Sequence, residues 1–329
     1  MKKGFYVGLF IALVAAFILN LKKIEQPKKP EVAKQQQGEI ESPPTATSTA
    51  IPESLSLKFY KELPDDIYFC GEHLILDENK KRTLADVMDA EIKGLSSDSI
   101  REIRNNMWFS YIRNELKAGG LHDDLKYVPI AESRLSPTAE SSEGAMGPWQ
   151  LMPGTADRFD LTIIPKDYDE RCDFVKSTEA AIEYLQELHK EFKNWSAALA
   201  AYNTGEENLR KAMEAKRTRD FYQLKTLHPE TQAFPFRVMA TKLIFKNPEK
   251  YGFSREGWLS ESVFAKWEIT EVSLNIDDEW MHIDQIIQGL KENFPDWDPS
   301  QFMKYNPHIL DSLFRGKYKV YLVKESGTS

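Results

Sequence analysis

Apolar side chains recur at steps of three and four residues through the middle of the chain, and this spacing limits the fold more than any other sequence feature. The clearest run covers residues 98–118 and is followed by two consecutive glycines, which favour the end of a helix there. Further helices are predicted over 177–192, 195–202 and 230–245. No strand-rich segment is found in this part, so residues 56–255 are predicted to form a mainly α-helical body.

The C-terminal part of the chain has a different pattern. Apolar residues partly alternate over 267–276, a helix-like stretch covers 283–294, and residues 318–323 have the composition of a strand. Residues 262–329 are therefore predicted to form a small α+β module with a short strand at each end. The predicted fold class is a mainly α protein that carries this module as an appendix.

The N-terminal segment is predicted to direct the chain to a membrane. Two lysines precede an apolar run within residues 1–21, which has about the length that a membrane-spanning helix requires. No small-residue cleavage signal follows the run, so an uncleaved signal anchor is favoured over a removed signal peptide. Residues 22–55 contain five of the 17 prolines and a run of three glutamines. This composition predicts a linker that holds the folded body away from the membrane.

The charge balance and the scarcity of metal ligands argue against several function classes. The chain has 43 Lys and Arg against 51 Asp and Glu, a net charge of −8, which argues against binding to the phosphate backbone of nucleic acids. The six histidines show no ligand spacing, so the sequence predicts no metal site and no cofactor. Cys70 and Cys172 can form at most one disulfide, which an oxidising compartment would permit. A bridge and two free thiols both stay open at this point.

One acidic residue lies in a mostly apolar segment. Glu132 follows the Val-Pro-Ile-Ala sequence of residues 128–131, near the end of a predicted short helix. A carboxyl group with apolar neighbours keeps its proton to higher pH, because desolvation disfavours the charged form. Such a group can act as a general acid near neutral pH. Taken alone, the segment favours the simpler interpretation of an exposed glutamate at a helix end.

The segment that follows changes this interpretation. Residues 139–156 contain Gly144 and Gly147, which let the backbone approach a ligand or a neighbouring helix closely. Trp149 offers an aromatic face for a sugar ring, and Gln150 offers an amide for hydroxyl or acetamido groups. Packing in the core is the alternative for Trp149. An aromatic ring and an amide that follow the acidic Glu132 are typical of a carbohydrate site.

Together with two later segments, these motifs resemble a known enzyme superfamily. The later segments are Ala-Tyr-Asn-Thr-Gly at 201–205 and Glu-Thr at 230–231. In this order the set resembles the goose-type lysozymes and soluble lytic transglycosylases, and most of all the membrane-bound lytic murein transglycosylases of the D type. The resemblance covers residues 60–252. It implies a lysozyme-like, mostly helical catalytic domain that cleaves peptidoglycan between N-acetylmuramic acid and N-acetylglucosamine.

The resemblance also implies roles for single residues. Glu132 corresponds to the family's one catalytic acid and base, and Gln150 to its substrate-positioning glutamine. Tyr202 and Asn203 match the motif that lines the cleft beside the acid. The substrate-binding residues that the motifs and the resemblance predict are Ser133, Gly144, Gly147, Trp149, Gln150, Tyr202, Asn203 and Glu230. Simpler alternatives stay open for three of them: Tyr202 as a core aromatic, Asn203 as a helix C-cap, and Glu230 as a residue that the helix dipole favours.

The predicted mechanism needs a single carboxylate. Most glycosidases use two, but the 2-acetamido group of the substrate can supply an internal nucleophile instead. Glu132 would protonate the leaving oxygen and then take the proton of the muramyl 6-hydroxyl, giving a 1,6-anhydro product without water. Phe234 stands where the family often has tyrosine, which puts in doubt how acid and substrate are oriented. A hydrolytic muramidase and a catalytically silent peptidoglycan-binding scaffold are the alternatives.

The C-terminal module and the cellular location follow from weaker signals. Residues 269–324, with Tyr-Asn-Pro at 305–307, resemble a divergent LysM-like module, a βααβ unit that binds glycans containing N-acetylglucosamine. A structural cap on the catalytic domain is an equal alternative. The predicted location is the periplasm or cell envelope, with the N-terminal segment in the membrane and glycan strands as the partner.

Overall fold

The computed structural model describes residues 55–259 and 267–325. The predicted anchor over 1–21 and nearly all of the predicted linker over 22–55 lie outside the described residues. Within the described ranges, no helix combines the length and the apolar character that crossing a membrane requires.

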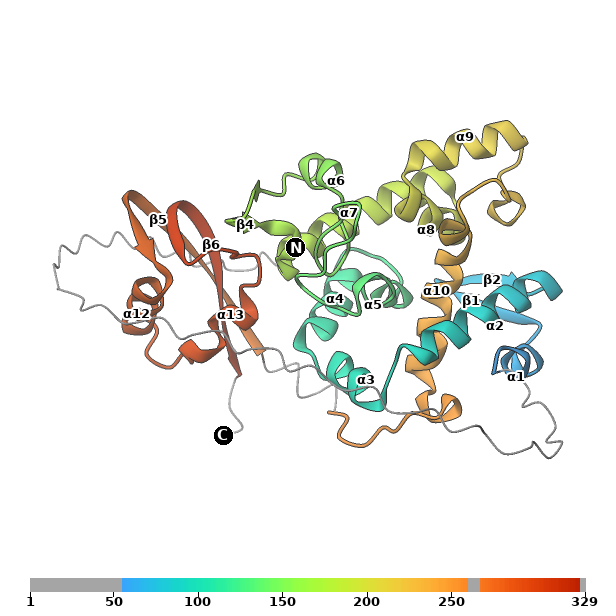
Figure 1. The fold of residues 1–329 in the computed structure, drawn as a ribbon, viewed down its shortest axis with the longest axis horizontal. Helices are drawn as coiled ribbons and strands as arrows, with labels where there is room; N and C mark the ends of the chain where they lie inside the picture. Colours follow the sequence, from blue (N-terminus) through green and yellow to red (C-terminus); the bar gives the residue numbers. More distant parts are fainter. Residues whose placement is uncertain (1–54, 260–266, 326–329) are drawn as a thin grey trace, which may run out of the picture.

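The body is built of helices, as predicted, with two short hairpins between them (Figure 1). Its α-helices are α1 (Leu55–Glu62), α2 (Glu78–Lys93), α3 (Ser97–Arg104), α4 (Met107–Ala118), α5 (Val128–Ser133), α6 (Pro153–Arg158), α7 (Phe174–Phe192), α8 (Trp195–Thr204), α9 (Glu206–Lys216) and α10 (Pro229–Lys246). Its 3-10 helices are η1 (Asp123–Tyr127), η2 (Glu170–Cys172), η3 (Phe221–Gln223) and η4 (Pro248–Tyr251).

The predicted helix over 98–118 is two helices, α3 and α4. Asn105 ends the first, and Asn106 caps the second by accepting a hydrogen bond from the Trp108 N–H at 3.0 Å. Asparagine satisfies free backbone groups better at a helix end than inside a helix, so two in succession break the helix although the apolar spacing continues.

The body also contains two short hairpins that the sequence did not predict. Strands β1 (Asp66–Phe69) and β2 (Glu72–Ile75) form one antiparallel hairpin, and β3 (Ile163–Ile164) and β4 (Tyr168–Asp169) form another. The two-residue turn of the first hairpin is Cys70-Gly71, and both residues have positive φ (50° and 79°). Such turns usually carry Asn-Gly or Asp-Gly, so cysteine at the first position gave no recognisable turn signal.

A buried helix organises the core around the site. Residues 195–202 of α8 are all buried, which explains why this helix is apolar on every side. Helix α8 packs against α7, α9 and α10, and α10 also packs against α2 and α5. In Figure 1, α10 runs past α8 and α5 in the centre of the body. Elements far apart in the sequence therefore meet at α5.

The C-terminal module has the predicted order of strand, helices and strand. Strand β5 (Trp267–His282) pairs antiparallel with β6 (Leu313–Glu325), and both are longer than predicted. Between them lie α12 (Ile283–Asn293), η5 (Pro299–Gln301) and α13 (Phe302–Tyr305). The module has its own apolar core and lies at one end of the molecule, with β1 and β2 towards the other end (Figure 1).

The module is docked on the body through β4 and the start of α7. The Asp169 N–H donates to the His308 carbonyl at 2.9 Å, and the Leu310 N–H donates to the Asp167 carbonyl at 2.8 Å. Asp173, which caps α7, lies 3.8 Å from His308, and both side chains are fully buried. Backbone pairing and a buried polar contact thus fix the module to the helical body.

Both cysteines are free thiols in the structure, so the disulfide that the sequence left open is not formed. Cys70 lies in the turn between β1 and β2, and Cys172 lies in η2. Both are buried, and burial raises the pKa of each thiol above its ordinary value. They are packing residues here.

Candidate active site

Glu132 lies in the last turn of α5, in the centre of the body (Figure 1). Pro129 lies in the first turn of this helix, and Arg134 ends it in the left-handed conformation (φ 55°). The Glu132 carboxyl is partly buried and makes no hydrogen bond or ion pair with any residue that the structure describes. Burial raises its pKa to about 8, since few polar groups replace the water that the carboxylate loses. A carboxyl group so placed can hold its proton near neutral pH.

Two charged residues act on Glu132 from α10. Arg237 lowers the pKa of Glu132, which partly offsets the effect of burial, and Glu230 raises it. Glu230, Phe234 and Arg237 are spaced by four and three residues, so they share one face of α10. Because α10 packs on α5, this face brings a positive and a negative charge near the acid.

Arg237 is held between two carboxylates. It lies 3.6 Å from Glu91 of α2 and 3.7 Å from Glu230. Glu91 also pairs with Arg134 at 3.4 Å, directly after α5. Sequence reasoning missed Glu91, Arg134 and Arg237, because their distances along the chain give no sign that α2 and α10 meet at α5. The only available signal was the helical spacing from Glu230 to Arg237.

Tyr202 lies at the site and is fixed by the backbone of the neighbouring loop. Its hydroxyl donates to the Trp149 carbonyl at 2.7 Å. Burial, and next the charge of Glu132, raise the pKa of Tyr202 well above its ordinary value, so it remains a neutral donor. Its ring is parallel to Phe234, with 6.5 Å between ring centres. Phe234 is fully buried, so this ring packs the site from α10.

Asn203 joins α8 to α10. The Thr231 hydroxyl donates to the Asn203 side-chain oxygen at 2.8 Å, which leaves the amide nitrogen as a donor. The alternative of a helix C-cap is wrong, because Gly205 ends α8 and its N–H donates to the Ala201 carbonyl. Asn203 therefore holds α8 on α10, next to Tyr202, which lies near Glu132.

Trp149 is not the predicted sugar platform. Its side chain is 0% exposed, and the indole N–H donates to the Thr178 hydroxyl at 2.9 Å. A face for a sugar ring must be exposed, so the alternative of a core aromatic is correct. The backbone carbonyl of Trp149 still contributes to the site, since it orients Tyr202.

Gln150 and Ser133 hold the loop together in the structure. The Gln150 amide nitrogen donates to the carbonyls of Ala139 and Gly147, both at 2.9 Å. Its side-chain oxygen is thus the atom that a ligand could use. The Ser133 hydroxyl lies 2.9 Å from the Pro148 carbonyl and also accepts the Ser136 N–H at 3.1 Å. These bonds join α5 to the loop.

The two glycines serve the loop in different ways. Both have φ +82°, a conformation that side chains disfavour. A Cβ at Gly147 would lie 1.8 Å from the Arg171 carbonyl oxygen, whereas a Cβ at Gly144 would meet nothing within 4 Å. Gly147 thus permits close approach to η2 of the body, and the structure gives it no contact role toward a ligand.

One group of possible metal ligands forms in the described part of the chain. Cys70, His122 and Asp124 place ligand atoms within 4.8 Å of one another, which their separation along the sequence did not predict. Lys242 donates to the same Asp124 carboxylate at 2.6 Å. Its ammonium already neutralises this carboxylate, so the arrangement fits an ion-paired structural cluster better than a cation site.

Residues 110–225 match the family model of the transglycosylase SLT domain. This match covers about a third of the chain. The predicted resemblance to the lytic transglycosylases is thereby confirmed. Glu132, the loop with Gln150, and Tyr202 lie inside the SLT segment, whereas Glu91, Glu230 and Arg237 come from elements outside it.

The chain is also similar to proteins of known name. The chain is 34% identical over 155 residues to membrane-bound lytic murein transglycosylase D of Escherichia coli strain K12, and the match covers 46% of this chain and 34% of the relative. It thus spans about a third of that relative's length. An inactive variant of the lytic transglycosylase Slt of Pseudomonas aeruginosa is 25% identical, with a TM-score of 0.34 over 43% of this chain and 24% of that one. The 70 kDa soluble lytic transglycosylase of Escherichia coli is 17% identical, with a TM-score of 0.37 over 55% of this chain and 38% of that one.

Proposed function

We propose that the protein is a peptidoglycan lytic transglycosylase in which Glu132 is the single acid and base. The observation that carries this proposal is the contrast between Glu132 and its neighbouring carboxylates. Glu91 and Glu230 are both ion-paired to Arg237, while Glu132 is partly buried without a paired cation and has a pKa of about 8. Glu132 can therefore deliver a proton near neutral pH, whereas Glu91 and Glu230 hold Arg237 in place.

The reaction follows from this arrangement. Protonated Glu132 gives its proton to the glycosidic oxygen, and the bond from that oxygen to C1 of N-acetylmuramic acid breaks. The acetamido oxygen of the same sugar attacks C1 and forms a cyclic intermediate. The Glu132 carboxylate then takes the proton of the 6-hydroxyl, whose oxygen displaces the acetamido oxygen. The product is 1,6-anhydromuramic acid, and Glu132 is protonated again.

Arg237 has a defined part in this cycle. Between the two proton transfers Glu132 is an anion in a poorly solvated place, where an opposite charge stabilises it more than in water. Arg237, held by Glu91 and Glu230, supplies that charge without a full ion pair to Glu132. Without a direct ion pair the resting acid keeps its proton, and the nearby charge of Arg237 still stabilises its anionic form.

Analysis of the cleavage products tests the proposal. Purified peptidoglycan digested with the full chain is expected to yield muropeptides ending in 1,6-anhydromuramic acid, which mass spectrometry detects as a loss of water. Reducing-end muramic acid alone would instead show the hydrolytic muramidase. Binding of peptidoglycan without any soluble product would show the catalytically silent scaffold.

The location and the C-terminal module belong to the same proposal. The E. coli relative is named as membrane-bound, and this supports a cell-envelope location with the N-terminal segment as the tether. The module has the strand, helix, helix, strand order of a LysM-like unit and is docked on the catalytic body. A module so placed can bind the glycan strand that the body cleaves.

The charges on α10 give opposite shifts of the pH profile. Activity needs protonated Glu132, so kcat/KM of the wild type is expected to fall as pH rises through about 8. Arg237→Gln removes a charge that lowers this pKa, so the alkaline limb should move to higher pH while kcat falls about tenfold. Glu230→Gln removes a charge that raises the pKa, so the limb should move to lower pH. Shifts in the same direction for both variants would contradict this electrostatic model.

The same pKa makes a prediction about stability. Glu132 titrates near 4.5 when unfolded and near 8 when folded, so the native state binds more protons and its stability decreases as pH rises from 4.5 to 8. Glu132→Gln removes this loss. Its Tm should exceed that of the wild type by a few degrees at pH 8 and match it near pH 4, as measured by differential scanning calorimetry. An equal difference at both pH values would show that Glu132 is not destabilised by burial.

A further inference from the structure

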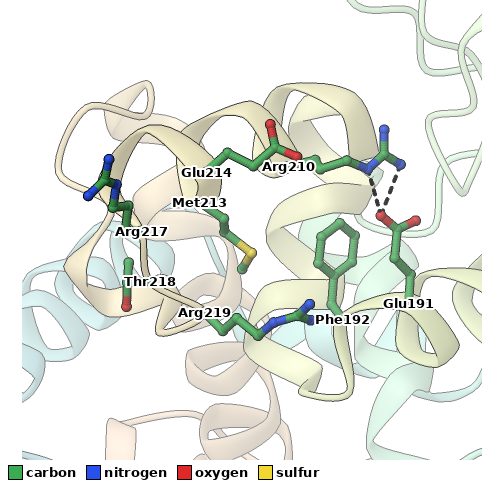
Figure 2. A pocket seen from close by; sticks show the side chains of 8 residues that line it. All are labelled: Glu191, Phe192, Arg210, Met213, Glu214, Arg217, Thr218 and Arg219. Atoms are coloured by element: carbon green, nitrogen blue, oxygen red, sulfur yellow. Dashed lines mark hydrogen bonds and ion pairs between the residues drawn. The ribbon is translucent and has the colours of Figure 1, made fainter.

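A pocket lies away from Glu132, between the end of α7, helix α9 and the turn that follows α9. Figure 2 shows its lining, and its volume is 520 Å³. Phe192 and Met213 form an apolar, mostly buried floor. Arginines line the rim: Arg210 from α9, and Arg217 and Arg219 from the turn.

The arginines of this pocket differ in their partners. Arg210 donates to the Glu191 carboxylate at 3.0 Å, so these two charges neutralise each other. Arg217 and Arg219 are exposed, and their guanidinium groups make no hydrogen bond or ion pair with residues 55–259 or 267–325. Glu214, the other acidic residue of the lining, pairs with neither of them. Two guanidinium groups are thus free for an anion, in a chain whose net charge is −8.

The backbone that carries the two arginines is held in place. Arg217 closes α9 in the left-handed conformation (φ 54°), and its N–H donates to the Glu214 carbonyl at 3.0 Å. The Thr218 N–H donates to the Met213 carbonyl at 3.1 Å, which completes a Schellman motif. The Thr218 hydroxyl then accepts the Asp220 N–H at 3.1 Å. A fixed turn lowers the entropy cost of binding at the side chains that it carries.

The pocket lies on a helix surface that begins at the candidate active site. Tyr184 of α7 packs on Tyr202, with 5.4 Å between ring centres, and donates to Glu206 at the start of α9 at 3.0 Å. Arg217 follows Glu206 by eleven residues, which is about 16 Å along a helix at 1.5 Å per residue. An extended peptide of four to five residues, at about 3.3–3.6 Å each, covers the same distance.

We propose that Arg217 and Arg219 bind a carboxylate of the peptide attached to the glycan strand, while the strand itself lies at Glu132. This inference rests on the proposed function, because only a peptidoglycan substrate brings such a peptide to this surface. The planar guanidinium group fits a carboxylate with two parallel hydrogen bonds, and the apolar floor fits alanine methyl groups beside it. The pocket would thus select strands that still carry their peptides.

Direct binding of a free peptide tests the site without any cleavage. The probe is the tetrapeptide L-Ala-D-Glu-diaminopimelate-D-Ala, titrated into the full chain by isothermal calorimetry. Replacement of both arginines by alanine is expected to weaken binding about tenfold, and conversion of the peptide carboxylates to carboxamides should weaken it equally. The matched control is Lys211→Ala with Lys216→Ala, which removes two positive charges from α9 outside the pocket and should leave the affinity unchanged. Equal affinity of wild type and double arginine variant, or no binding by the wild type, would overturn the proposal.

A kinetic comparison separates this site from the proposed function. The double arginine variant should have a raised KM on peptide-bearing strands and unchanged kinetics on strands stripped of peptide by an amidase. An equal loss on both substrates would assign the arginines to stability or to the glycan site, against the proposal. If the wild type cleaves neither substrate, the proposed function fails, and the calorimetric result still decides whether the pocket binds the peptide.

Discussion

Glu132→Gln is expected to lower the rate of peptidoglycan cleavage by at least about 10³-fold while glycan binding is retained. The amide has the shape of the protonated carboxyl group, so the packing around α5 changes little. It can neither give a proton to the glycosidic oxygen nor take one from the 6-hydroxyl, and both steps of the cycle therefore lose their catalyst. Release of soluble muropeptides measures the rate, and co-sedimentation with insoluble peptidoglycan measures the binding.

A matched control keeps this result specific. Glu183 lies exposed on α7 in the same SLT segment, so Glu183→Gln removes the same charge by the same chemical change and should leave the rate near that of the wild type. Comparable cleavage by Glu132→Gln and the wild type would refute Glu132 as the acid. Loss of binding together with turnover would instead assign Glu132 to substrate binding.

The helical part of the fold follows from the sequence to a large extent, because burial on one side of a helix leaves a periodic signal. The short helix that carries Glu132 and the helix over 195–202 were predicted differently, from continuous apolar runs. The hairpin at Cys70-Gly71 was not predicted, because its residues adopt positive φ without the usual asparagine or aspartate. A contact with a distant residue helps to fix this turn, since the Cys70 N–H donates to the Asp124 carboxylate at 2.8 Å.

The site itself was predicted only where one continuous segment carries it. Glu132 and its neighbours in sequence have local motifs, whereas Arg237 and Glu91 reach Glu132 through the packing of α10 and α2. For Trp149 the local motif itself led to a wrong prediction. An aromatic residue in a glycine-containing loop looks available to a sugar, and only the hydrogen bond to Thr178 and full burial reveal a core role. Residue type tells which chemistry is present, but burial decides whether it is accessible.

The loop that follows α5 is wrapped around Arg171. This guanidinium donates to the carbonyls of Gly144 at 2.7 Å and Leu151 at 3.1 Å, and it is paired with the buried Asp169. The backbone of Gly147 passes so close to the Arg171 carbonyl that no side-chain atom fits between them. The loop therefore has one tightly determined position, and that position sets the carbonyl that holds Tyr202.

Gly147→Ala is therefore expected to destabilise the protein by about 3 kcal/mol or more. The left-handed conformation costs a residue with a Cβ about 1–2 kcal/mol, and overpacking against the Arg171 backbone adds about 1–3 kcal/mol. Gly144 has the same φ of +82°, but a Cβ there would have open space around it. Gly144→Ala should therefore cost only the conformational term of about 1–2 kcal/mol. Urea unfolding of the two variants measures the difference. Equal losses would show that the close approach to η2 is relieved by movement of the loop, and cleavage by Gly147→Ala should then fall because the carbonyl that positions Tyr202 has moved with it.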